Sequence, residues 1–193
     1  PTPTATPTPT FYFADIHGEP TDVEQYMLEL INRARSNPAE EGERLLNTRF
    51  GYYGAVRDGQ DPRIFLETFA SYAPQPPMSM NAKLLKAARI RTEDMVANNS
   101  YFLGHMGSDG SMPSDRLASS GYDGDGGGEN ACLGPATPDY HHIAAVVDWG
   151  NPSLGHRNAI LNIYNVYVPI IEVGTAMTYD ATATTELDYS KYA

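Results

Sequence analysis

Three short glycine-containing segments carry the side chains best suited to chemistry: GHMGSDG around His105, GGGEN around Glu129 and WGNPSLGHRNAIL around His156. Each segment places an imidazole or a carboxylate beside glycine, where the backbone can approach a ligand closely. Two imidazoles and one carboxylate are a donor set for Zn²⁺ or another divalent metal, with positions left open for water. The spacings of 24 and 27 residues do not form a local metal motif, so only the fold could bring the three together.

His156 has a structural interpretation as well as a functional one. It precedes Ala159 and Ile160 by three and four residues, so in a helix it shares their inward face. An inward histidine is often a core residue whose ring is satisfied by a backbone carbonyl. The spacing therefore predicts an inward His156 and leaves its role open.

Four aspartates among glycines offer a second cation hypothesis. They are Asp109, Asp115, Asp123 and Asp125. Calcium loops of the helix-loop-helix type space their acidic ligands regularly, and these residues do not follow that spacing. Solvated turn aspartates are the favoured interpretation, with calcium as the minor alternative.

Three other residues have plain structural interpretations. His141 and His142 are adjacent, so on a helix they diverge by about 100° and cannot serve one site; we expect both at the surface. Cys132 is the only cysteine, which excludes an internal disulfide and favours a small buried apolar side chain.

Helices must position most of these groups. Thr21 and Glu24 have capping-box spacing at the start of an amphipathic helix, and Asn37-Pro38 can end it and begin a second helix. A long core helix is predicted to start after Asn81. Between residues 47 and 77, glycine and proline clusters predict an irregular excursion with one short helix.

The second half of the chain changes character. SDRLASS predicts a short helix that stops at Gly121, and Thr137-Pro138 begins a helix through Val147. SLGHRNAILN is a further short helical pattern. The segment YVPIIEVGTAMTY, rich in β-branched and aromatic residues, predicts a strand with a bulge near Pro169 or Gly174. The order of elements predicts an α+β fold, with helices dominating the first two thirds and strands toward the C-terminus.

Composition limits the possible partners. The chain has 193 residues, of which 41% are hydrophobic, enough for one domain with a sizeable core. Its 13 basic and 24 acidic residues give a net charge of −11, which argues against nucleic acid or anionic lipid as a partner. No window is apolar enough for a transmembrane segment. Residues 1–10 alternate threonine and proline, as linkers between extracellular modules do, so we expect a linker at 1–10 and a single domain at 11–193.

Five segments in this order resemble the signatures of the bacterial CAP superfamily, the cysteine-rich secretory, antigen 5 and pathogenesis-related group also called SCP-like. They are LELINRAR, LLKAARIRTEDM, the H-x-x-x-D-G turn, G-E-N and W-x-N-x-x-G-H-R, and they span about residues 21–177. The resemblance implies a three-layer α-β-α sandwich. It also implies a cavity lined by two histidines and usually two glutamates, which on matching positions gives His105, Glu129 and His156.

The chain departs from the family pattern in three respects. Many eukaryotic members have a second glutamate three residues after the helix tryptophan, where this chain has Pro152 after Trp149, so the resemblance implies a triad. The disulfides of the eukaryotic branch are also absent, as in the bacterial branch. Family members usually add a further strand near the C-terminus, and TATTELDYSKYA offers no clear candidate for it.

Two functions from different classes follow. The resemblance favours a secreted or surface-attached binding module, part of a longer protein, whose cleft binds a divalent metal or a small apolar ligand while an extracellular small molecule, lipid or protein is its partner. The alternative is a metal-dependent or acid-base hydrolase, peptidase- or esterase-like, with Glu129 as general base and His105 and His156 binding metal or polarising the substrate.

Overall fold

The computed structural model of the chain describes residues 19–57, 61–100, 104–124, 128–134, 137–163 and 170–178. The expected linker at 1–10 lies outside these residues, as do Pro169 and Asp125. Within the described residues the elements are α1 (Asp22–Ser36), α2 (Pro38–Leu46), α3 (Arg49–Arg57), α4 (Pro62–Ser71), β1 (Ser79–Met80), α5 (Ala82–Ala97), α6 (Pro113–Ser120), α7 (Pro138–Val147), α8 (Gly155–Ile160) and β2 (Glu172–Val173).

The helix starts follow the capping residues of the sequence. Thr21 Oγ1 accepts the N–H of Glu24 at 3.3 Å, and the Glu24 carboxylate accepts the N–H of Thr21 at 2.7 Å, which completes the predicted capping box of α1. Asn37, Asn81 and Thr137 likewise cap α2, α5 and α7. These predictions are confirmed, because short polar side chains satisfy the unpaired N–H groups of a first helical turn.

Residues 47–77 contain more helix than predicted. One short helix was expected there, and the structure has both α3 and α4. Gly54, which falls within the expected irregular excursion, lies inside α3, and a Cβ on it would come within 2.3 Å of Cε3 of Trp149. The glycine therefore allows a tryptophan to approach the helix closely, so tertiary packing decides the structure of this segment.

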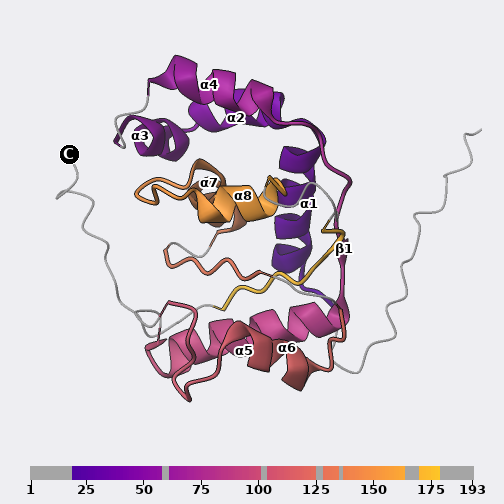
Figure 1. Cartoon of the computed structure of the whole chain (residues 1–193). Helices are drawn as coiled ribbons and strands as arrows, with labels where there is room; N and C mark the ends of the chain where they lie inside the picture. The colour runs from indigo at the N-terminus through magenta and orange to yellow at the C-terminus, as the bar shows by residue number, and fades with distance from the viewer. Residues whose placement is uncertain are drawn as a thin grey trace, which may run out of the picture.

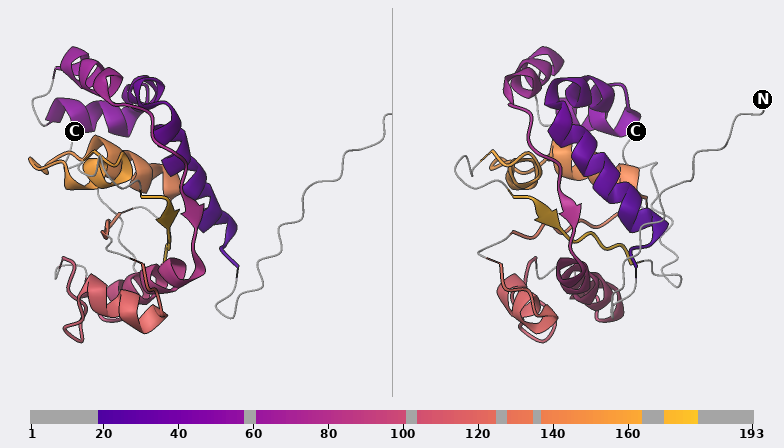
Figure 2. Two further views of the ribbon diagram at one scale, coloured as in Figure 1. Left: turned by 45° about the vertical axis from the view of Figure 1, so that its right-hand side comes forward. Right: turned by 90° about the vertical axis from the view of Figure 1, so that its right-hand side faces the viewer.

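The helices form two groups with extended chain between them. The first group comprises α1–α4, α7 and α8, in which α2 packs against α4 and α7 packs against α1 and α3. The second group is the pair α5 and α6. Figures 1 and 2 show β1 and β2 lying between the two groups. The described part of the chain is thus mostly helical, with two short strands, as an α+β class allows.

The two strands pair in parallel, with Ser79 opposite Glu172 and Met80 opposite Val173. The predicted strand at the C-terminal end therefore exists, but only two of its described residues meet strand geometry. Directly after β2, Gly174 passes against the start of α5, where a Cβ would lie 2.0 Å from the carbonyl carbon of Leu84. Only glycine fits this crossing between the central pair and the second helical group.

A buried arginine joins distant parts of the first group. Arg35 on α1 is fully buried, and its guanidinium donates to the carbonyls of Pro76, Ile160 and Ile170 at 2.9, 2.7 and 2.9 Å. Five donors in a planar fork suit such multiple contacts. The apolar core around it consists of residues including Leu28, Ile31, Ala34, Leu45, Ala55, Phe65, Phe69, Ile143, Val146, Val147, Ile160 and Leu161.

Across the described residues, no helix combines the length and apolar character needed to cross a membrane.

Candidate functional site

His105 and Glu129, predicted as site residues from separate segments, are in direct contact. Nδ1 of His105 lies 3.0 Å from Oε1 of Glu129. The imidazole is half exposed, whereas the carboxylate is 19% exposed. The structure therefore brings together two of the three predicted site residues across 24 positions of sequence.

Arg116, on α6, holds this pair in place. Its Nη2 donates to Oε2 of Glu129 at 2.7 Å and to the backbone carbonyl of His105 at 2.9 Å. The arginine side chain is only 3% exposed, so the charge-assisted contact is shielded from water. Sequence reasoning missed Arg116; the only signal was an arginine inside the short helical pattern SDRLASS.

His156, the third predicted residue, is bound to a different carboxylate. Nδ1 of His156 lies 2.7 Å from Oδ1 of Asp148, and Oδ2 of Asp148 accepts the backbone N–H of His156 at 2.9 Å. Asp148 is almost fully buried and has left-handed backbone geometry, with φ of 55°. Sequence reasoning missed Asp148, although it lies directly before Trp149, the first residue of the segment WGNPSLGHRNAIL.

The contact with Asp148 sets the protonation of His156. The hydrogen bond to Asp148 raises the pKa of His156, against the opposing effect of burial. Burial alone would raise the pKa of Asp148, but hydrogen bonds from His156 and from the N–H of Arg157 outweigh it and lower that pKa. Asp148 is therefore ionised at neutral pH, and neutral His156 carries its proton on Nδ1, which leaves the Nε2 lone pair available.

The two carboxylate-imidazole pairs lie near each other. Nδ2 of Asn130, the residue after Glu129, donates to the backbone carbonyl of His156 at 3.2 Å. Within the described residues, Nε2 of neither His105 nor His156 has a hydrogen-bond partner. The same residues include no group of three His, Cys, Asp or Glu arranged to hold a metal ion. The structure thus places two available Nε2 atoms on neighbouring segments rather than a closed three-ligand centre.

A pocket of about 330 Å³ adjoins His156. It lies between α7, the loop that follows α7 and the segment 128–134. Its lining consists of Cys132, Leu133, Tyr140, Ala144, Asp148, Trp149, Gly150, Asn151 and His156. The volume is at the lower end of the range for small-molecule sites, so one compact ligand would fill it.

Cys132 is a poor nucleophile in this pocket. Burial raises the pKa of its thiol to about 11, and the nearby charge of Asp148 adds to the effect. The thiolate is the reactive form, so the thiol is inert at neutral pH. The expected role of a small buried apolar side chain fits this environment.

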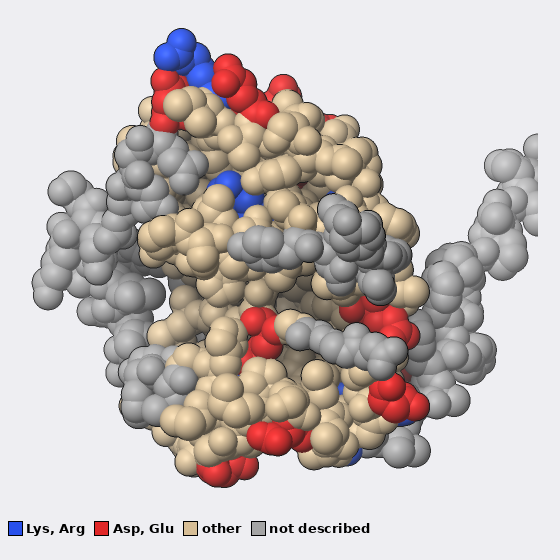
Figure 3. Space-filling view, viewed as in Figure 1, with Lys and Arg blue, Asp and Glu red and all other residues tan. Residues whose placement is uncertain are grey.

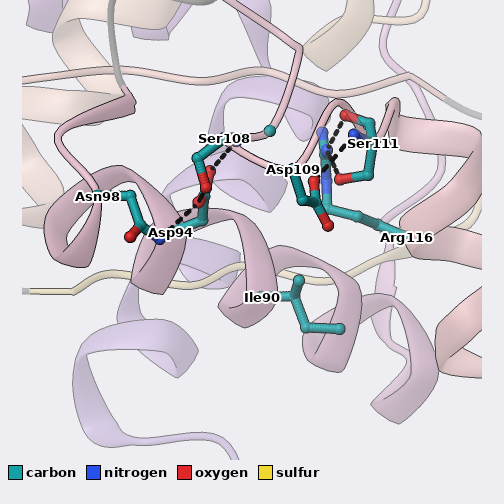
Figure 4. A pocket seen from close by; sticks show the side chains of 8 residues that line it. Ile90, Asp94, Asn98, Ser108, Asp109, Ser111 and Arg116 are labelled. Carbon is teal, nitrogen blue, oxygen red and sulfur yellow. Dashed lines mark hydrogen bonds between the residues drawn. The ribbon is translucent and has the colours of Figure 1, made fainter.

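A second pocket, of about 220 Å³, lies between α5 and the turn that follows His105 (Figure 4). Asp94 occupies one end, where its carboxylate accepts from Asn98, Ser100 and Ser108. Burial alone would raise the pKa of Asp94, but these hydrogen bonds outweigh it and lower that pKa well below its usual range. The Asp94 carboxylate therefore links the end of α5 to the turn that follows His105.

The aspartates of the calcium hypothesis have local roles. Asp109 accepts the N–H of Ser111 at 2.9 Å, and Asp115 accepts the N–H of Met112 at 2.8 Å at the start of α6. Asp123 forms an exposed ion pair with Lys83 at 3.5 Å. Asp125 lies outside the described residues. The three described aspartates are thus turn, cap and surface residues.

His142 is buried, which overturns its predicted surface position. Its Nε2 lies 2.9 Å from Oε1 of Glu41 on α2, and both side chains are 1% exposed or less. The adjacent His141 is half-buried. The prediction failed because α7 is covered by both α1 and α3, so neighbouring positions on it lose solvent together.

The face of the molecule in Figure 3 is hollowed between the first helical group and the α5–α6 pair. Asp and Glu atoms are more abundant than Lys and Arg atoms on this face, in keeping with the net charge of −11. An anionic ligand would meet unfavourable potential here.

The chain matches no protein-family model, no curated protein and no solved structure.

Proposed function

We propose that the chain is an extracellular binding module of the CAP type, in which His105, Glu129 and His156 form the base of a ligand-binding cleft. The supporting observation is that two imidazoles, on neighbouring segments, are each oriented through Nδ1 by a carboxylate and each keep Nε2 available. Such support fixes both the tautomer and the direction in which Nε2 can meet a ligand.

A three-layer α-β-α sandwich is the proposed architecture. The separation of the helices into two groups, with β1 and β2 between them, supports it. Three of the five signature segments carry the three site residues His105, Glu129 and His156, and the Thr/Pro tract at 1–10 supports a secreted or surface-attached module of a longer protein.

A divalent metal such as Zn²⁺ is one proposed ligand of the cleft. Histidines that bind zinc commonly donate the other ring N–H to a carboxylate, as both imidazoles do here. Two nitrogens fall short of the three protein ligands usual in zinc sites, and the described residues provide no third donor in place. The proposed binding function therefore does not require a metal. Titration with Zn²⁺ tests whether the cleft binds one.

In the hydrolase alternative, the observed contacts favour a general base other than Glu129. Both oxygens of Glu129 are engaged, one by His105 and the other by Arg116, so Glu129 orients its neighbours. His156 is the better base, because buried Asp148 holds its Nδ1 and would stabilise the imidazolium that forms when Nε2 takes a proton. A hydrolase would thus depend on His156 and Asp148 more than on Glu129.

Zinc-dependent thermal stability tests the cleft. If Zn²⁺ binds the folded state, the melting temperature rises with free metal by mass action. Binding weakens as pH falls, because protonated imidazoles cannot ligate a metal. We expect His105→Ala and His156→Ala each to remove most of the shift, with His141→Ala as the matched histidine control.

Two results would contradict the proposal. One is hydrolysis of peptide, ester or cell-wall substrates that His156→Ala abolishes, which would favour the enzyme. The other is a zinc response that His141→Ala removes as fully as His156→Ala, which would place the metal elsewhere.

A further inference from the structure

The pocket beside His156 has apolar and aromatic walls. Leu133, Tyr140, Ala144 and Trp149 line it. The ring centroids of Tyr140 and Trp149 are 6.4 Å apart, and the two rings are nearly perpendicular, at 78°, in an edge-to-face pair. Walls of this kind suit a ring-shaped apolar ligand.

The polar groups of the pocket are mostly committed to one another. The Asp148 carboxylate accepts from Nδ1 of His156 and from the N–H of Arg157. Asn151 donates from Nδ2 to Asp148 and accepts from Ser153 Oγ at 2.7 Å. Nε2 of His156 is left, within the described residues, as the ring nitrogen able to meet a ligand.

The loop that carries these groups is held in one conformation. Asp148 and Leu154, at its two ends, have left-handed φ values of 55° and 51°, which non-glycine residues adopt at a cost. Buried Arg157 donates to the carbonyls of Val146 and Val147 at 2.7 and 2.5 Å and so fixes the end of α7 where the loop begins. Asp148 is itself 2% exposed. These contacts therefore preorganise the loop that lines the pocket.

We propose that this pocket is a subsite for a small neutral alcohol with an apolar ring, whose hydroxyl donates to Nε2 of His156 while Trp149 and Tyr140 contact the ring. This inference rests on the proposed function and names the ligand class of its His156 side. A hydroxyl donor matches the lone pair on Nε2 of His156, and the side chains of Leu133, Ala144 and Trp149 offer apolar contacts to a ring. Net charge of −11 disfavours an anion in the same place.

Trp149 makes the test direct, because it is the only tryptophan of the chain. Its emission reports occupancy of this pocket when benzyl alcohol or toluene is titrated. The quantity to compare is the ratio of the toluene Kd to the benzyl alcohol Kd, in wild type and in His156→Phe. Phenylalanine keeps a ring at this position but removes the acceptor, so we expect the ratio to fall by about fivefold.

Two results would overturn the inference. An unchanged ratio would show that Nε2 does not recognise the hydroxyl. Tighter binding of benzyltrimethylammonium than of benzyl alcohol would show that the two aromatic rings recognise a cation.

A second measurement on wild type covers the case in which His156→Phe fails to fold. The ¹⁵N resonance of Nε2 of His156 should shift on addition of benzyl alcohol and stay in place with toluene; equal responses would refute hydroxyl recognition.

Failure of these tests alongside a zinc response that depends on His105 and His156 would reject the alcohol subsite alone. Failure of the zinc test leaves the Trp149 readout intact, so the two proposals are judged separately.

Discussion

Glu41 on α2 accepts a hydrogen bond from Nε2 of His142 on α7 at 2.9 Å, and the side chain of Glu41 is completely buried. Arg33 donates to the same carboxylate through Nε and Nη2, at 2.7 and 2.8 Å. One anion therefore joins three helices of the first group, since Arg33 belongs to α1. Burial alone would raise the pKa of Glu41, but the hydrogen bonds from His142 and Arg33 outweigh it and lower that pKa to about 2.

We expect Glu41→Gln to lower the free energy of unfolding by about 1.5–3 kcal/mol, because a neutral amide no longer accepts charge-assisted hydrogen bonds from Arg33 and Arg44. Urea denaturation measures the change. Glu40→Gln is the matched control on the same helix: Glu40 is 58% exposed and pairs with Arg44 at the surface, so its loss should cost less than about 1 kcal/mol. Equal effects of the two substitutions would contradict a buried role.

The Glu41 carboxylate should also make the free energy of unfolding depend on pH in the acidic range. The folded pKa of Glu41 is about 2, below its usual value of 4.5, so its contribution is present above 4.5. That contribution is lost as pH falls through the folded pKa. We therefore expect the difference between wild type and Glu41→Gln, measured by urea denaturation across this range, to shrink as pH decreases. A constant difference would show that the charge of Glu41 is unimportant.

Arg116→Met should loosen the turn that carries His105. The substitution leaves Glu129 without its buried cation and the His105 carbonyl without its donor, and we expect a loss of about 3–5 kcal/mol. Hydrogen exchange of the Gly107 amide, which bonds the carbonyl of Ser111 at 2.7 Å, reports the turn itself. Arg63→Met is the control, because Arg63 forms a surface pair at 85% exposure. Unchanged exchange at Gly107 would be inconsistent with this role.

Asp148→Asn should lower the pKa of His156, since the hydrogen bond to Asp148 raises it in the native protein. NMR titration of the ring measures this directly. The raised pKa of His156 also means that the pair stabilises the fold fully below the usual pKa of 6.5 and loses this effect as pH rises through the raised value. Asp139→Asn, on the exposed side of α7, should leave the His156 titration in place; a matching shift there would argue against a specific Asp148 effect.

Gly174→Ala should destabilise the crossing between β2 and α5. Its Cβ would lie 2.0 Å from the backbone of Leu84, which cannot move without moving the start of the helix, so we expect a cost of about 2–3 kcal/mol. Gly128→Ala is the control, because a Cβ there meets nothing within 4 Å. Thermal denaturation of both variants gives the comparison, and similar melting temperatures would disprove the close approach.

Local chemistry made much of the helical structure predictable. Thr21, Asn37, Asn81 and Thr137 each cap a helix because their side-chain oxygens reach the N–H groups two or three residues ahead. Helix starts of this kind depend on residues close together in the sequence, so the sequence pattern predicts them. Gly54 behaved differently, since its reason for being glycine is the ring of Trp149, almost a hundred residues away.

The candidate site divides in the same manner. Sequence patterns singled out His105, Glu129 and His156 as candidates, because a resemblance covers the segments that carry them. They did not find Asp148 and Arg116, the groups that orient His156 and Glu129. An aspartate before a tryptophan or an arginine in a short helix is common in proteins, and only three-dimensional contact distinguishes these two. The same limit applied to His142, whose partner Glu41 lies 101 residues away.

The three carbonyl contacts of Arg35 also have a consequence for the folding reaction. They span sequence separations of 41, 125 and 135 residues, so they can close only after the chain has brought distant segments together. Contacts of this range slow two-state folding relative to helical proteins with local contacts. We expect Arg35 to engage after the rate-limiting step, so that its removal chiefly accelerates unfolding and leaves the refolding rate nearly constant. The contacts of Arg35 would then raise the activation free energy of unfolding and so slow the loss of the native state.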